Sequence, residues 1–316
     1  MPRVLVVHYS QTGQLSDVVN HMVQPLVEDD NVEVVFECVK PKQAFPFPWP
    51  FIYFFCIFPE CVYMKPIELE PLSITEDDEF DLVILGYQVW FLAPSLPISS
   101  FLQHPIAKKV LKDKPVVTVI ACRDMWLMGQ EKVKMLLSKV GARLIDNVAL
   151  VDECGSGMSF LSTPLWMFTG KRGPFGPVPK AGVGQQDIKN SRRFGEKLIQ
   201  SLNAPQADLS QSQLKGMGAV TIKEKYIASE TIANRSFHIW GKLLMACGDQ
   251  HSFMRRLVVR LYIAFLITLI LTVVPISALI KKLISPLTRK RIQQQKAYFA
   301  APSGEANNCS EASINE

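Results

Sequence analysis

A chain of 316 residues with 48% apolar and 20% charged residues can bury a sizeable core and is too apolar to be intrinsically disordered. Its net charge of +5 is unevenly distributed, with basic clusters at residues 255–260, 281–282 and 289–291. Because these clusters flank an apolar run, they favour lipid head groups over nucleic acid as the partner.

The seven cysteines are widely spaced and form no CxxC pair, which favours reduced thiols in a cytoplasmic setting. A disulfide between Cys56 and Cys61 is the less favoured alternative. The apolar run in Met1–Tyr9 is too short for a signal peptide. The five histidines are scattered without metal-ligand spacing, so no metal site is expected.

Predicted strands and helices alternate along the first 204 residues. The continuous apolar run in Arg3–His8 is typical of a central parallel strand that is buried on both faces. Four further strands are predicted at Val32–Val39, Phe80–Gly86, Pro115–Cys122 and Arg143–Val151. Apolar spacing predicts helices at Leu15–Leu26, Pro97–Leu111, Gly129–Val140 and Gln185–Leu202. This order predicts an α/β domain at 1–204, with a flavodoxin-like five-stranded parallel sheet, helices on both faces and ligands at the carboxyl ends of the strands.

An aromatic and proline-rich insert at 45–64 interrupts this domain. Prolines at positions 46, 48, 50 and 59 argue against one regular helix. Two interpretations stay open: a cover packed over the sheet, or a wall or lid for a hydrophobic substrate or a shallow membrane contact.

A hydrophobic segment at 255–286, which we expect to be helical, follows a connecting region at 205–254. Its centre, Tyr262–Ile280, has nineteen residues without a charge, the usual length of a membrane-spanning helix. We therefore expect association with membrane lipid. Basic residues at both ends leave open whether the segment spans the bilayer or dips in and returns at Pro275.

The tail at 287–316 is basic and then polar, and we expect disorder after Pro302. The five strands and their helices are complete by Leu202. The α/β domain is therefore expected to fold without the residues from Arg255 onward.

The loop between the first strand and the first helix is the most informative stretch, since backbone N–H groups and the helix dipole favour an anion there. Ser10 and Thr12 offer hydroxyl donors, Gly13 permits a positive φ, and the loop lacks the lysine of nucleoside triphosphatases. It resembles the FMN-phosphate loop of the flavodoxin family, S/T-x-T-G-x-T, with Leu15 in place of the final threonine. By this resemblance the FMN phosphate is held by Ser10, Gln11, Thr12, Gly13, Gln14 and Leu15. The alternative is a plain helix N-cap.

Two more loops follow the third and fourth strands. Gln88, Val89, Trp90 and Phe91 occupy the position that holds the flavin ring in flavodoxin-like NAD(P)H oxidoreductases, and aromatic faces suit an isoalloxazine. A packed Trp–Phe core pair is the alternative. We expect Trp90 to shape the ring pocket.

The loop after the fourth strand contains Cys122, Arg123, Met125 and Trp126, at the other edge of a flavodoxin-type cofactor site. Arg123 is the candidate catalytic cation, to stabilise negative charge on the flavin or substrate, and the alternative is a surface ion pair with Asp124. Cys122 has no activating base nearby and is not expected to be a nucleophile. A basic loop at Thr169–Pro177 either caps the site or is only a connection.

The segments HYSQTGQL, LGYQVWFLAPSLPI, ACRDMWLMGQEKV and AYFAAPSG together resemble the bacterial dialkylresorcinol-forming (condensing) enzymes of aryl-polyene and flexirubin-type pigment pathways. The resemblance implies an FMN-dependent oxidoreductase. It would aromatise the cyclohexanedione-type ring that a ketosynthase-like partner makes, a two-electron oxidation. A lipophilic substrate would explain a position at the cytoplasmic face of the inner membrane. A role for NAD(P)H and a homo-oligomeric state stay open.

Two other functions stay in view. The same flavin and membrane segment would serve an NAD(P)H:quinone-type reductase. A non-enzymatic electron carrier or scaffold for the ketosynthase is the third hypothesis, and the net basic charge argues against the carrier, since carriers of this fold tend to be acidic.

Overall fold

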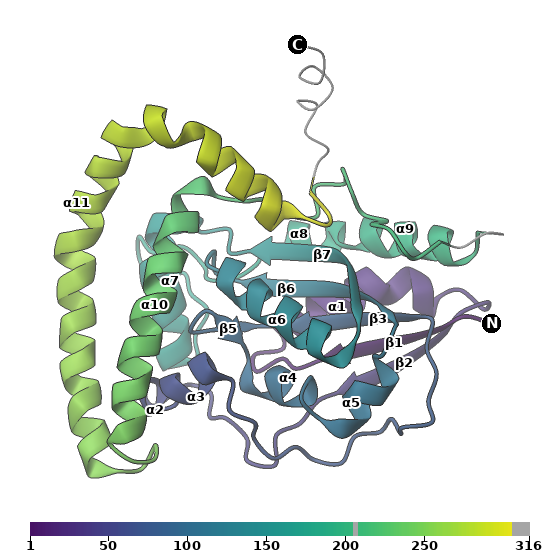
Figure 1. Cartoon of the computed structure of the whole chain (residues 1–316), viewed down its shortest axis with the longest axis horizontal. Coiled ribbons are helices and arrows are strands. Elements are labelled where there is room, and N and C mark those ends of the chain that lie inside the picture. The colour runs from purple at the N-terminus through teal and green to yellow at the C-terminus, as the bar shows by residue number, and fades with distance from the viewer. Residues whose placement is uncertain (205–207, 305–316) are drawn as a thin grey trace.

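The computed structural model describes residues 1–204 and 208–304, apart from the side chains of residues 156 and 273–288. A five-stranded parallel sheet runs through the centre in the order β2-β1-β3-β6-β7 (Figure 1). The strands are β1 (Arg3–His8), β2 (Glu33–Cys38), β3 (Leu82–Tyr87), β6 (Pro115–Cys122) and β7 (Arg143–Val151). All four neighbouring pairs are parallel, which confirms the predicted sheet.

Helices cover both faces of the sheet. On one face lie α1 (Gln14–Val27), α8 (Gln185–Asn190) and α9 (Arg192–Leu202), and on the other α4 (Leu96–Phe101), α5 (Pro105–Val110) and α6 (Leu127–Val140). Successive strand residues point to opposite faces, so Val4 and Val6 pack with the first set of helices, and Leu5 and Val7 with the second. This is the flavodoxin-like arrangement that the sequence predicts.

Two predicted helices are each divided in two. The expected helix at Pro97–Leu111 breaks before Pro105, because proline disfavours helical backbone at the preceding residue. His104 instead caps α5 and accepts a hydrogen bond from the backbone N–H of Ile106 at 3.3 Å. The expected helix at Gln185–Leu202 is interrupted at Ser191, between α8 and α9.

The insert forms two short helices, α2 (Phe51–Cys56) and α3 (Phe58–Tyr63), with Ile57 between them. Their buried side chains pack against the C-terminal helices, as in the cluster of Phe58, Val62, Leu244 and Tyr262. The six cysteines among the described residues are all free, so the favoured prediction of reduced thiols holds for them and Cys56 is not bonded to Cys61.

Helices α7 (Gly155–Thr169) and α10 (Glu224–Ala246) were not predicted, whereas α11 (Phe253–Ala300) contains the expected helical segment at 255–286 and extends beyond both of its ends. Helix α7 contains two glycines and Pro164, which lower its helix propensity. Helices α10 and α11 form a long antiparallel pair along one side of the domain, and α11 then bends back over the sheet (Figure 1).

Both ends of α11 are fixed to the α/β domain. Near its start the buried Arg255 is paired with Glu60 of α3. After its end Ser303 is buried, accepting from the backbone N–H of Asn147 at 2.6 Å and donating to Asp146 at 2.7 Å. Residues 303 and 304 are thus ordered parts of the fold, and the rest of the tail, 305–316, lies outside the described residues. A chain truncated before Arg255 would lose these contacts with the α/β domain. The sequence predicts that the domain folds without them, and we expect the truncated domain to be less stable than the full chain.

Among the residues whose side chains are described, no helix has a stretch that is long and apolar enough to cross a membrane. Residues 273–280 of the uncharged run lie outside that set.

Candidate functional site

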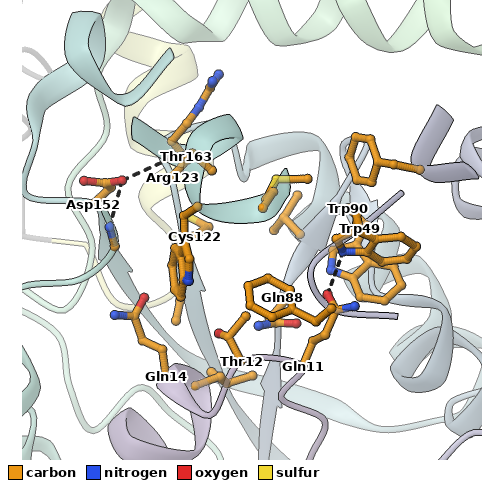
Figure 2. A pocket seen from close by; sticks show the side chains of 18 of the residues that line it. Gln11, Thr12, Gln14, Trp49, Gln88, Trp90, Cys122, Arg123, Asp152 and Thr163 are labelled. Carbon is orange, nitrogen blue, oxygen red and sulfur yellow. Dashed lines mark hydrogen bonds between the residues drawn. The ribbon is translucent and has the colours of Figure 1, made fainter. Parts of the chain in front are cut away.

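A cavity lies at the carboxyl edge of the sheet, where the three loops singled out in the sequence meet (Figure 2). Its lining includes most of the predicted site residues: Gln11, Thr12, Gln14, Leu15, Gln88, Val89, Trp90, Phe91, Cys122 and Arg123. In an open parallel sheet this is the edge at which ligands bind. The fold thus brings together residues that are more than a hundred positions apart in the chain.

The first loop contains two hydroxyl groups to consider: Thr12 lines the cavity, whereas Ser10 beside it is not among the lining residues. The Oγ of Ser10 and the Oγ1 of Thr12 are buried, and neither has a hydrogen-bond partner among the described residues. Gly13 precedes α1 with φ of +82°, in the left-handed region that favours glycine. Buried polar groups in native proteins are normally paired. Two orphan hydroxyls at a helix N-terminus therefore fit an anionic ligand such as a phosphate.

The two glutamines of this loop have structural roles. Gln11 donates to the carbonyl of Pro46 and accepts from the Nε1–H of Trp49, both at 3.0 Å, which ties the loop to the insert. Gln14 accepts from the backbone N–H of Val183 at 3.1 Å and donates to its carbonyl at 3.3 Å. Their side-chain amides are thus already engaged. Leu15 is fully buried and is also one of the residues that line the cavity.

The second loop is a tight hairpin that presents aromatic rings. Strands β4 (Val89–Trp90) and β5 (Ala93–Pro94) are joined by Phe91 and Leu92, which have positive φ of 49° and 58°. Two-residue hairpins of this kind require positive φ at both turn residues, which costs energy outside glycine and is held here by packing. Gln88, just before the hairpin, has a buried Oε1 without a partner among the described residues.

Trp90 is surrounded by other aromatic rings. It makes edge-to-face contacts with Trp49 at 5.6 Å, Phe45 at 5.1 Å and Tyr9 at 6.0 Å between centroids. Trp90 thus belongs both to a packed cluster and to the cavity wall, and contact of this loop with a flavin ring stays a prediction.

The third loop holds Arg123 in the cavity wall. The guanidinium lies over the ring of Phe160, 4.1 Å from its centroid, and donates to the sulfur of Met125 at 3.7 Å. Burial lowers the pKa of Arg123, and nearby acidic groups oppose that shift. The alternative of a surface ion pair with Asp124 is wrong. Asp124 is buried and binds Lys223 and the hydroxyl of Tyr226 instead.

The other predicted residues of this loop differ in position. Cys122 lines the cavity, and burial raises the pKa of its thiol well above the usual value, which keeps it protonated. Trp126 is buried in the core of the domain, and neither it nor Met125 lines the cavity. The basic loop at Thr169–Pro177 is not part of the lining, and its Arg172 donates to the carbonyls of Ala181 and Val183.

One side of the cavity, formed by Asp152 and helix α7, was not predicted from the sequence. Asp152 follows β7, and its carboxylate accepts from the backbone N–H of Cys154 at 2.8 Å and that of Gly182 at 3.0 Å. It also accepts from the hydroxyl of Thr163 at 3.3 Å (Figure 2). Helix α7 adds Thr163, Trp166 and Met167, and the insert adds Phe47, Trp49 and Phe54. Asp152 lies at the same sheet edge as the other loops, and its place after the fifth strand was an available signal.

The described residues contain no group of three or more histidine, cysteine, aspartate or glutamate side chains that would hold a metal ion.

Neither a protein-family model nor a curated protein matches this sequence. Similar solved structures include a flavoprotein in complex with FMN from Lactobacillus acidophilus, with 16% identity over 47% of this chain and 93% of that chain and a TM-score of 0.38. A flavodoxin from the domain Archaea has 9% identity over 64% of this chain and 99% of its own, with a TM-score of 0.37. A flavone reductase has 11% identity over 65% of each chain and a TM-score of 0.35. These scores are too low to assign a family. Strand order and loop positions define the class instead: an α/β protein of flavodoxin-like topology with a cavity at the carboxyl edge of its sheet.

Proposed function

We propose that this protein is an FMN-dependent oxidoreductase that aromatises a lipophilic cyclohexanedione-type ring to a dialkylresorcinol. The main support for FMN as the cofactor is a pair of buried hydroxyls at the N-terminus of α1, those of Ser10 and Thr12. Neither has a hydrogen-bond partner among the described residues. These hydroxyls and the neighbouring backbone N–H groups would hold the phosphate of FMN. Gln88, whose buried Oε1 is also unpartnered, would meet a polar edge of the flavin ring.

The lining of the cavity supports an apolar ring as substrate. Trp49, Phe54, Trp90, Phe91 and Trp166 offer aromatic faces, as a flat ring requires. When bound, FMN would supply a two-electron acceptor for a hydride from the ring, and a proton would leave as the resorcinol forms. Arg123 would stabilise the negative charge of the enolate from which the hydride departs.

The aromatisation itself, the ketosynthase-like partner and the position at the cytoplasmic face of the inner membrane come from the family resemblance and are part of the proposal. A product with two long alkyl chains partitions into lipid, which supports a position at the membrane. The aromatic lining of the cavity suits the same lipophilic molecule.

The first test is the absorbance spectrum of the purified protein, which we expect to show one FMN per chain. The T12D variant places a negative charge against the phosphate and should weaken FMN binding about a hundredfold or more, whereas T12S keeps the hydroxyl and should bind nearly as wild type. Fluorescence titration of the apoprotein measures both. A wild-type protein that binds no FMN after reconstitution refutes the proposal.

The second test is an anaerobic half-reaction of oxidised enzyme with a cyclohexanedione-type substrate. We expect the flavin absorbance to bleach as resorcinol appears. Bleaching by NADPH but never by this substrate would favour the quinone reductase. A colourless protein that still binds a ketosynthase would favour the scaffold.

A further inference from the structure

We propose that the outer face of the first half of α11, residues 253–272, docks on the surface of a bilayer that contains anionic lipid. The lipid surface is inferred from the exposed side chains and the charge of α11. The purpose of docking, delivery of a lipophilic substrate, rests on the proposed function.

The face is apolar and open to solvent. Phe253 is 74% exposed, Leu261 61% and Leu271 70%. Five more apolar side chains of this stretch are exposed: Met254, Leu257, Phe265, Ile267 and Ile270. The opposite side of the same helix is buried, with Val259 and Tyr262 packed against the insert. An apolar surface of this extent is rare on a protein that has no partner.

The charge of α11 indicates which partner covers this face. The helix contains nine lysines and arginines and no aspartate or glutamate over its 48 residues. Arg256 and Arg260 are exposed beside the apolar side chains, and Arg289, Lys290 and Arg291 are exposed further along. A second copy of α11 would bring like charges together. Anionic head groups instead complement the arginines while the apolar side chains enter the acyl boundary, as for a helix that lies in the plane of the interface.

The fold holds this face outward. Arg255 fixes the start of α11 to the insert, and Ser303 fixes the chain after its end. Helix α10 lies between α11 and the sheet, and α11 forms the outermost layer on this side (Figure 1). The helix therefore does not need to detach from the domain in order to meet a membrane.

A continuous series of aromatic contacts joins this face to the cavity. Phe91, in the cavity wall, lies 5.1 Å from Phe58, and Phe58 is stacked on Tyr262 at 5.1 Å. Tyr262 is 5.2 Å from Trp240, which is 5.2 Å from the exposed Phe265. Aromatic rings in mutual contact thus lead from the exposed Phe265 to the cavity wall at Phe91. None of these five aromatic residues is charged. Alkyl chains that move along them from the bilayer to the cavity would therefore contact uncharged rings.

The test uses the full chain and vesicles of phosphatidylcholine with or without phosphatidylglycerol, in a co-sedimentation assay. We expect binding to the anionic vesicles that weakens as salt is raised. The L261E/L271E variant should lose at least tenfold in binding. The R256Q/R260Q variant should lose about thirtyfold on anionic vesicles and little on neutral ones, since each basic residue near the surface contributes about fivefold. Val27→Glu and Met135→Glu, which change exposed apolar residues on α1 and α6, are the matched controls.

Equal binding by wild type and L261E/L271E would overturn the proposal. The proposal would also be overturned if the wild-type protein did not bind vesicles but formed a dimer, and the L261E/L271E variant were monomeric. The face would then be an interface between two copies of the chain. The flavin spectrum and the half-reaction with a short-chain, water-soluble substrate should be unchanged in both variants. A protein that binds vesicles as expected but no FMN would refute the proposed function and leave the docking surface intact.

Discussion

Arg255 provides a quantitative test of how the C-terminal helices are held to the α/β domain. Its side chain is 1% exposed and pairs with both carboxylate oxygens of Glu60, one of them at 2.9 Å. It also donates to the carbonyls of Cys56 at 2.6 Å and Gly248 at 3.2 Å. The R255M variant keeps much of the side-chain volume but leaves one carboxylate and two carbonyl groups unpaired.

The expected loss follows from these contacts. Breaking a buried ion pair by removing one partner costs about 3–5 kcal/mol. The side chain of Glu60 is 21% exposed, so water reaches the abandoned carboxylate and the lower end, about 3 kcal/mol, applies. Neutralising Glu60 as well, in R255M/E60Q, should recover part of this loss because no unpaired charge remains.

Equilibrium unfolding in urea without lipid measures the free energy of unfolding for each variant. The control is R256M, which removes the same charge from an exposed neighbour and should change the stability by less than about 0.5 kcal/mol. An R255M protein as stable as R256M would show that the ion pair does not fasten α11 to the insert.

Two further predictions concern α10 and the third loop. The R123A enzyme should keep its FMN and turn over about a hundredfold more slowly in the anaerobic half-reaction, because Arg123 lines the cavity and has no ion-pair partner among the described residues. R123K should restore part of the rate. A normal rate for R123A would reduce the role of this side chain to packing against Phe160. Glu230 of α10 is fully buried, accepts from the backbone N–H of Met128 at 3.0 Å, and burial raises its pKa from 4.5 to about 7. Between these pH values the folded protein binds more protons than the unfolded chain, so this group lowers the stability as pH rises through that range. We therefore expect the stability of E230Q relative to wild type to increase by up to about 3 kcal/mol from pH 5 to pH 8, and unfolding curves whose difference does not change with pH would contradict the assigned pKa.

The three predicted loops of the cavity were predictable because each lies directly after a strand whose apolar run identifies it. Once β1, β3 and β6 are placed in a parallel sheet, the loops at Ser10, Gln88 and Cys122 must meet at one edge. The residue types in those loops also carry information, since hydroxyls, glycine and aromatic rings suit a phosphate and a flat ring. Local pattern and chain order therefore determined the sheet and half of the cavity.

Other features depend on contacts that no local pattern records. The wall formed by Thr163 and Trp166 lies on α7, whose glycines and proline hide its helical character. Within the predicted loops, the side chains of Gln11 and Gln14 are engaged by residues of the insert and by Val183, and Trp126 turns into the core. Only the folded chain decides which polar atoms remain free for a ligand.

The apolar C-terminal run shows the same division between sequence and structure. Its composition indicates an affinity for lipid, and both faces of the helix have similar hydropathy in the sequence. Packing against the insert buries Val259 and Tyr262 and leaves Leu261 and Leu271 exposed. The amino-acid sequence by itself determined the sheet, its order and the chemistry of its loops, because these follow from short-range periodicity. Tertiary structure decided three other features: the buried Arg255–Glu60 pair, the outer face of α11, and the side of the cavity formed by Asp152 and α7. Each depends on residues brought together from distant parts of the chain.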